Sequence, residues 1–94
     1  MKIRYYIDPE TDLPHLYGHD VSEEEVEEIL DHAGEDRPGR DDSRVAIGQT
    51  SGGRYLRVIY VSDPEPRSVF VITAYELRGK PLVAYRRRRR RKAR

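Results

Sequence analysis

The chain has 94 residues, of which 36% are hydrophobic and 37% are charged, and its formal net charge is +1. This length predicts one domain with a modest core, because so short a chain buries only about 60–65% of its unfolded surface. It contains no cysteine, which excludes a disulfide framework, a thiolate metal site and a cysteine nucleophile. No apolar run approaches the roughly 20 residues of a membrane span, and the N-terminus lacks a secretory signal. We therefore expect a cytoplasmic protein with no membrane partner.

The small net charge averages two segments of opposite sign. Residues 86–94 hold eight of the 18 Lys and Arg residues and no acid, which leaves residues 1–85 with a balance of −7. The acids are concentrated in residues 20–42. Such segregation says more about partners than the sum does. We divide the chain into a folded domain, residues 1–85, and an Arg-rich tail, residues 86–94.

The first predicted elements are a short strand and an acidic helix. Residues 3–7 form the strand candidate, and a polar connection follows over residues 10–20. Ser22 suits a helix N-cap, and Glu25, three residues on, completes a capping box. The next apolar residues have the i, i+3, i+4, i+7 spacing of one helical stripe; they are Val26, Ile29, Leu30 and Ala33. Gly34 ends the predicted helix.

Residues 35–43 carry turn formers and charges but no apolar residue, so we expect an exposed loop. Three runs rich in β-branched and aromatic residues then alternate with two compact turn sequences, which is typical of an antiparallel meander. The runs span residues 44–50, 54–61 and 67–77. The second and third runs are apolar on both alternations, which predicts central strands covered on both faces.

A second helix is expected after the last strand. Pro81 suits its first turn, and Leu82 and Tyr85 can dock its beginning on the domain. Six adjacent arginines follow, and their mutual repulsion predicts that the end of the helix frays. The resulting order, β-α-β-β-β-α, predicts a small α+β domain in which a twisted antiparallel sheet is packed by one acidic helix.

Two segments resemble the BrnT-type toxins, a branch of the RelE/ParE-like superfamily of bacterial toxin–antitoxin systems. Residues 18–26, Gly-His-Asp-Val-Ser-Glu-Glu-Glu-Val, are similar to the family segment KHGVSFEEA. Residues 46–58 are similar to its hairpin pattern AIGxTxxGRxLxVV. With the last strand, this resemblance covers about residues 15–77. Residues 71–88 resemble more closely the ending VITAYxLxGKPxxAYRRR of a sister group of small domains that has no established activity.

The resemblance implies a fold of helix-backed antiparallel strands, an RNA-cleaving activity and a cognate antitoxin protein as partner. Two features depart from the family pattern. Gly18 stands where the family usually has a lysine, and Tyr75 and Glu76 stand where it places basic groups. These departures affect the expectation of catalysis more than that of fold.

RNA cleavage without a metal requires a base for the 2′-hydroxyl proton, cations for the phosphorane and an acid for the leaving oxygen. Arg57 is a candidate cation, because a charge inside an apolar strand needs a phosphate or an ion pair, for example with Glu76. Arg54 matches a family arginine, and Arg78 lies near the catalytic arginine of RelE-like toxins; both also suit exposed, solubilising positions. His19 is the candidate acid or base, because its ordinary pKa lies near neutrality. Its alternative role is to hydrogen-bond its own loop.

The arginine run is the strongest electrostatic feature. Clustered cations release the counterions of a polyanion, which predicts salt-sensitive, sequence-blind binding to RNA, DNA or anionic lipid. Packing of the run on the acidic helix, or solubility alone, is the alternative. Two tyrosines can stack on bases or fill the core. The candidate binding residues are Arg86, Arg87, Arg88, Arg89, Arg90, Arg91, Lys92, Lys80, Tyr75 and Tyr85.

Three functions stay open from the sequence. The first, which the resemblance favours, is a metal-independent endoribonuclease toxin whose cleft combines the cationic candidates with His19. The second is a non-catalytic nucleic-acid-binding domain. The third is a protein-interaction domain whose acidic helix or sheet edge binds a partner such as an antitoxin.

No cofactor or metal is expected. His15 and His19 have i, i+4 spacing, but Pro14 and Gly18 disfavour the helix that would bring the two imidazoles together. The oligomeric state is not specified by the sequence, although an unprotected first strand or an unpaired edge at residues 44–49 would allow two copies to pair.

Overall fold

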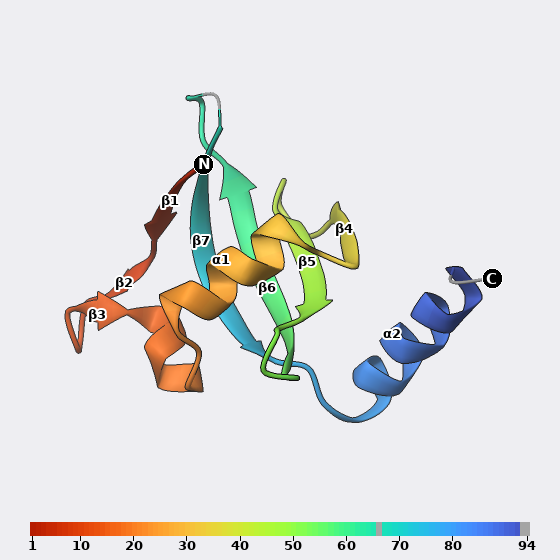
Figure 1. The fold of residues 1–94 in the computed structure, drawn as a ribbon. Helices are drawn as coiled ribbons and strands as arrows, with labels where there is room; N and C mark the ends of the chain where they lie inside the picture. Colours follow the sequence, from red (N-terminus) through yellow and green to blue (C-terminus); the bar gives the residue numbers. More distant parts are fainter. Residues whose placement is uncertain (66, 93–94) are drawn as a thin grey trace.

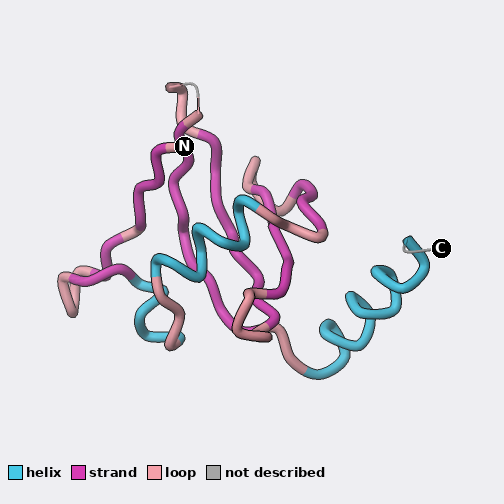
Figure 2. Tube along the Cα trace, viewed as in Figure 1, coloured by secondary structure: helices cyan, strands magenta, loops and turns pink. Residues whose placement is uncertain are grey.

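A computed structural model describes residues 1–65 and 67–92, and Figures 1 and 2 show the path of the chain. The elements of this described part are β1 (Lys2–Tyr5), β2 (Ile7–Asp8), β3 (Leu13–Pro14), the 3-10 helix η1 (His15–His19), α1 (Glu23–Asp31), β4 (Glu35–Pro38), β5 (Arg44–Gln49), β6 (Tyr55–Ser62), β7 (Ser68–Glu76) and α2 (Gly79–Lys92). Pro66 in the predicted second turn and residues 93–94 of the predicted tail lie outside the described residues. The predicted α+β fold is confirmed.

The main sheet has the strand order β1-β7-β6-β5-β4. The predicted meander is confirmed, because β5, β6 and β7 pair antiparallel in sequence order. The prediction of a wholly antiparallel sheet is wrong at β1, which runs parallel to β7 from the pair Lys2↔Ser68 to the pair Tyr5↔Val71. These two strands are distant in sequence, so no turn between them specifies their relative direction.

An edge strand replaces part of the loop predicted over residues 35–43. Strand β4 pairs antiparallel with β5, from Glu35↔Ile47 to Pro38↔Arg44. It is held by backbone hydrogen bonds and buries little, so its hydrophobic pattern gives no strand signal. Because β4 covers β5, the edge that we expected at residues 44–49 is not an edge.

Helix α1 crosses one face of β5, β6 and β7 (Figure 1). The predicted capping box is present: Glu25 N–H donates to Ser22 Oγ at 3.2 Å, and Ser22 N–H donates to Glu25 Oε1 at 3.0 Å. Val26 and Ile29 are fully buried. The helix ends with His32 as its C-cap rather than continuing to Gly34, and the chain turns there into β4.

The core lies almost entirely between α1 and the sheet. On β6, Leu56, Val58 and Tyr60 are buried on the α1 side, whereas the residues between them point to the opposite face. A second, smaller cluster on that opposite face contains Ile47, Leu77 and Tyr85. The expectation that both faces of β6 and β7 are covered is therefore only partly met, because α2 covers one end of the second face.

Helix α2 continues through the arginine run to Lys92, so the described arginines belong to a helix that begins at Gly79. In Figure 1 it stands beside the β5 and β4 end of the sheet. Tyr85 is the buried residue among those described in this helix. The fraying that mutual repulsion predicted is absent up to Lys92. Two arginines of the run, Arg88 and Arg89, bond to the segment that leads into β4.

Candidate functional site

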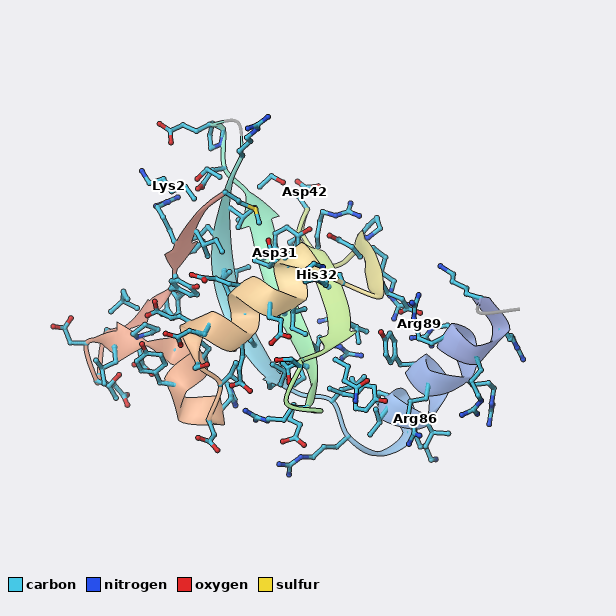
Figure 3. All side chains as sticks on the ribbon, viewed as in Figure 1. Lys2, Asp31, His32, Asp42, Arg86 and Arg89 are labelled. Atoms are coloured by element: carbon cyan, nitrogen blue, oxygen red, sulfur yellow. The ribbon has the colours of Figure 1, made fainter. Side chains whose placement is uncertain are left out.

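The outer surface of α2 carries a dense group of exposed cations, two of which, Arg86 and Arg89, are labelled in Figure 3. Within the described chain, six basic residues of the arginine run are exposed and form no ion pair; these are Arg86, Arg87, Arg89, Arg90, Arg91 and Lys92. Lys80 is exposed in the first turn. The sequence predicted a cluster of positive charge, and the helix holds these side chains in a regular arrangement.

Contacts of Tyr85, Arg88 and Arg89 help to hold α2 in place, and Leu82 packs on the same core cluster as Tyr85. Tyr85 is buried at the second core cluster, and Arg89 Nη1 donates to the Gly34 carbonyl at 3.0 Å. Arg88 forms a two-bond ion pair with Glu35, in which Nη2 donates to Oε1 at 2.9 Å. The hydrogen bond from Arg88 lowers the pKa of Glu35. One acid thus neutralises one arginine of the run and fixes the helix.

Gly34 allows the close approach of α2. A Cβ atom built at this position would lie 2.0 Å from Tyr85 Oη and 3.1 Å from Arg89 Nε. Any side chain here would therefore displace the tyrosine. The sequence indicated Gly34 only as the end of a helix, and the contact that requires glycine comes from a residue far along the chain.

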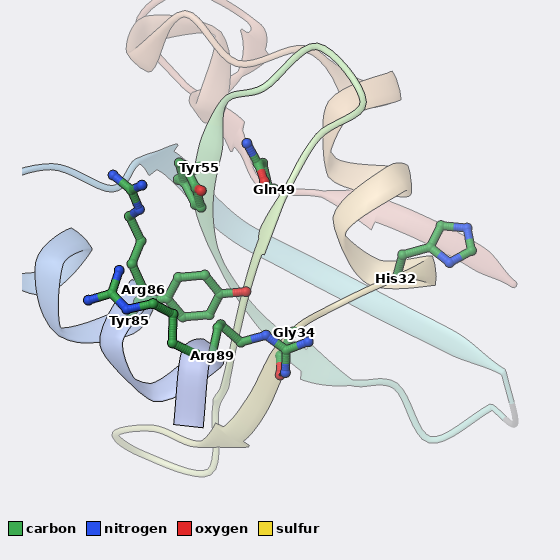
Figure 4. A pocket seen from close by; sticks show the side chains of 8 residues that line it. His32, Gly34, Gln49, Tyr55, Tyr85, Arg86 and Arg89 are labelled. Carbon is green, nitrogen blue, oxygen red and sulfur yellow. The ribbon is translucent and has the colours of Figure 1, made fainter. Parts of the chain in front are cut away.

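A pocket of about 430 Å³ lies between α2 and the β5–β6 hairpin (Figure 4). The Tyr55 and Tyr85 rings meet edge to face, with centroids 6.0 Å apart and planes at 71°. The Arg86 guanidinium carbon lies 5.9 Å from the Tyr55 ring centroid, within range of a cation–π contact. Gln49 and Arg89 also line the pocket, whereas the His32 ring points away from Tyr85. Aromatic faces and guanidinium groups therefore share one concave surface.

A second group of predicted residues gathers at the lower end of β7. His19 of η1 and Tyr75 have ring centroids 6.0 Å apart, and Arg57 Nη1 donates to Tyr75 Oη at 3.2 Å. His19, Tyr75, Glu76 and Arg78 line a pocket of about 260 Å³. The pairing of β6 with β7 and the packing of η1 on β7 thus bring together four of the predicted site residues. These are His19, Arg57, Tyr75 and Arg78.

Arg57 does not form the ion pair that was considered for it. Its guanidinium carbon lies 5.8 Å from the Tyr75 ring centroid, and its buried Nε atom has no hydrogen-bond partner in the part of the chain described. Glu76, the proposed partner, bonds instead to Arg54 and Arg78. Arg57 therefore contacts an aromatic phenol rather than a carboxylate.

Arg54 lies apart from the other candidates, on the α1 side of the sheet. Its Nη1 atom donates to both carboxylate oxygens of Glu25 at 2.9 Å and to the Asp20 carbonyl at 2.9 Å. Its Nη2 atom donates to Glu76 Oε1 at 3.4 Å. The structure gives Arg54 contacts that join α1, η1 and β7, and it does not place this residue with Arg57.

Glu76 bonds to Arg54 and also lines the pocket that contains His19 and Arg78. Arg78 Nη2 donates to its Oε1 at 3.2 Å, and this hydrogen bond is the main cause that lowers the pKa of Glu76. The carboxylate therefore stays ionised at neutral pH and adds negative charge to the pocket with His19. Among the residues that line this pocket, Arg78 is the cation that could offset that charge for an entering phosphate.

Other observations concern metals and membranes. His15 Nδ1 lies 3.5 Å from Asp8 Oδ2, and the His15 and His19 rings are 5.3 Å apart, because η1 forms despite Pro14 and Gly18. Across residues 1–65 and 67–92, no group of three or more His, Cys, Asp or Glu residues is placed to hold a metal ion. None of the described helices has the length and apolarity to cross a membrane.

Sequence reasoning missed Tyr55 and Gln49 as pocket residues. Both were expected only as ordinary strand residues. Their pairing across the hairpin follows from its register, Gln49↔Tyr55. The local sequence does not predict that α2 packs beside these two residues, because this packing depends on Gly34 and Glu35 from another segment.

Comparison with known proteins assigns the chain to a family. A family model described as a domain of unknown function, DUF4258, matches residues 17–76. No curated protein and no solved structure matches the chain. The matched segment contains His19, Arg57 and Tyr75 and ends before α2, so the basic helix lies outside it. The resemblance to BrnT-type toxins stays a prediction.

Proposed function

The chain belongs to the DUF4258 family of domains of unknown function, and we propose that it binds RNA through the exposed face of α2. The observation that carries this proposal is the set of exposed arginines fixed on one docked helix. Each phosphate contact releases condensed counterions, and this release drives binding. The choice of RNA over DNA rests on the resemblance to RNA-cleaving toxins.

The position of the two helices argues against self-neutralisation. The acidic helix α1 lies on the opposite face of the sheet from the core cluster that receives Tyr85. Among the ion pairs of the described residues, the run contributes only Arg88 with Glu35, which is on β4 rather than α1. Most of the charge on α2 is therefore available to an external polyanion.

Binding should be measured with a labelled RNA strand over a range of salt concentrations. The double variant Arg87→Gln, Arg91→Gln removes two exposed cations outside the Tyr55 pocket. It should weaken binding and reduce the slope of log affinity against log salt by roughly 1.4, since each phosphate contact on a single strand contributes about 0.7.

A matched control removes the same charge elsewhere. Arg40→Gln, Arg67→Gln changes two exposed arginines on loops away from α2 and should leave the salt slope nearly unchanged. Equal effects of the two double variants would show that overall charge, and not α2, governs binding.

A second candidate function, metal-independent RNA cleavage, is favoured by the cluster around Tyr75. In this proposal His19 takes the 2′-hydroxyl proton, Arg57 and Arg78 stabilise the phosphorane, and Tyr75 donates a proton to the leaving oxygen. Arg57 orients the phenol through the hydrogen bond to Tyr75 Oη. The Glu76 carboxylate in the same pocket opposes phosphate binding, so this proposal is weaker than the first.

Cleavage should be assayed with labelled RNA in the presence of a chelator. His19→Ala and Tyr75→Phe should each reduce product formation by roughly 100-fold or more, the usual contribution of a positioned acid or base. His15→Ala is the matched control, because His15 contacts His19 but does not line the pocket. Absence of cleavage by the wild-type protein would remove this candidate and leave RNA binding.

The toxin class implied by the resemblance adds two further proposals, a cytoplasmic location and an antitoxin partner. Growth arrest on expression, relieved by His19→Ala and by co-expression of a protein encoded in the adjacent gene, would support them. A solitary gene whose product leaves growth unchanged would contradict them.

A further inference from the structure

We infer that the pocket between α2 and the β5–β6 hairpin holds one unpaired base of the bound strand, so that this surface selects single-stranded RNA. The inference rests on the proposed RNA binding and makes it more specific. Exposed arginines alone would bind any polyanion of sufficient charge. The pocket adds a feature that can distinguish a free base from a paired one.

Tyr55 provides the stacking surface. Its ring and the Tyr85 ring are inclined at 71° in an edge-to-face pair, and Tyr85 is buried and packed against Gly34. The Tyr55 side chain is only half-buried, and the Arg86 guanidinium lies 5.9 Å from its ring centroid. Aromatic rings and guanidinium planes are the groups on which proteins stack unpaired bases.

Three arginines of α2 line the pocket together with this ring. Arg86 and Arg90 line the pocket one helical turn apart, about 6 Å along the axis of α2. Arg89 lies between them in sequence, and its bond to the Gly34 carbonyl fixes it at the pocket wall. A base in the pocket would therefore have guanidinium groups near the phosphates that flank it.

The pocket also has suitable size and polarity for a base. Its volume of about 430 Å³ lies within the range of about 300–1,000 Å³ that is usual for small-molecule sites. Gln49 at its mouth is exposed and donates through Nε2 to the Gly53 carbonyl at 3.3 Å. This bond leaves Oε1 as an acceptor for the edge of a base. Bases inside a duplex are stacked and paired, so their faces are not available.

The test compares three labelled RNA ligands of about ten nucleotides: a single strand, the same strand in a duplex, and an abasic strand of equal charge. The single strand should bind the wild-type protein most tightly. Tyr55→Ala should weaken single-strand binding by roughly 5- to 100-fold, the loss expected for one stacked base. Its affinity for the abasic strand and its salt slope should stay unchanged, because no phosphate contact is lost.

Two further variants keep the test decisive if Tyr55→Ala folds poorly. Tyr55→Phe retains the ring and should retain single-strand affinity. Arg86→Lys retains the charge but removes the planar guanidinium, so it should weaken binding of the single strand severalfold and spare the abasic strand. Circular dichroism establishes that each variant is folded.

The outcomes separate this inference from the proposed function. If no ligand binds, RNA binding itself is wrong. If the single strand, duplex and abasic strand bind with similar affinity, and Tyr55→Ala and Arg86→Lys behave as wild type, then α2 binds RNA but the pocket holds no base.

Discussion

The two helices of this protein pack on the sheet in different ways. Helix α1 buries Val26 and Ile29 completely and begins with a capping box, so its position follows from a continuous apolar stripe. Helix α2 has Tyr85 as its buried residue among those described, and two arginine bonds complete its attachment. The difference shows that α1 builds the domain, whereas α2 is attached to it mainly as a carrier of charge.

Arg54 and Arg57 also differ in their surroundings, although they are only three residues apart. Arg54 lies on the α1 side and is bonded to Glu25 and Glu76. Arg57 lies on the opposite side and contacts Tyr75. Positions of opposite parity on a strand point to opposite faces, so two arginines that look equivalent in sequence have different roles.

The largest expected effect tests the packing of α1. Ile29→Ala should reduce the free energy of unfolding by about 2–5 kcal/mol, because Ile29 is fully buried and the substitution leaves a cavity. Leu82→Ala on α2 should cost much less, since Leu82 is only partly buried. Urea denaturation of both variants measures the two losses. Similar losses would contradict the contrast between the helices.

The next effect tests the two arginines. Arg54→Met should reduce the unfolding free energy by about 1.5–3 kcal/mol, because it removes charge-assisted hydrogen bonds and leaves Glu25 without this partner. Arg57→Met should be close to neutral, since it also removes the cost of a buried Nε atom that lacks a partner in the described chain. Denaturation curves at neutral pH compare them. A larger loss for Arg57→Met would reverse the assignment.

Gly34→Ala tests how α2 is attached. The new Cβ would overlap Tyr85 Oη, and overpacking of this kind costs about 1–3 kcal/mol. Adding Tyr85→Phe removes the overlapping oxygen and should recover part of the loss. Stability of the single and double variants, measured by urea denaturation, checks both steps. A Gly34→Ala variant as stable as wild type would show that α2 does not approach Gly34 closely.

The smallest effect concerns pH. Arg88 lowers the pKa of Glu35 from its ordinary value of 4.5, so the ionised carboxylate stabilises the folded state. This contribution is fully present above about pH 4.5 and is lost as the pH falls through the lowered folded-state pKa. Arg88→Gln should therefore destabilise the protein at about pH 6 and much less at about pH 3. A difference from wild type that does not change with pH would contradict this ion pair.

The sequence was sufficient to predict the elements that rest on local patterns. Ser22 with Glu25 and the apolar stripe predicted α1, and the alternating runs predicted β5, β6 and β7. It also predicted a strand at residues 3–7, where β1 lies, but not that β1 pairs parallel with β7, because no turn joins these two strands. It did not predict β4, because an exposed edge strand leaves no hydrophobic period.

The candidate site was predictable in its residue types but not in its arrangement. The clustering of His19 with Tyr75 depends on the packing of η1 against β7, which no local pattern encodes. The separation of Arg54 from Arg57 could have been predicted, because positions of opposite parity on a strand face opposite sides of the sheet. The pocket at Tyr55 could not have been predicted from the sequence, since Gly34 and Glu35 position α2 from a distant segment.

The most direct test of RNA binding through α2 is photo-crosslinking of a 4-thiouridine RNA strand, followed by digestion after glutamate and mass spectrometry. Glu76 is the last acid of the sequence, so such digestion releases residues 77–94 as one peptide. We predict crosslinks in that peptide and in the peptide that contains Tyr55, with few on α1. Crosslinks distributed evenly over the protein, or confined to segments other than α2 and the Tyr55 hairpin, would contradict the account.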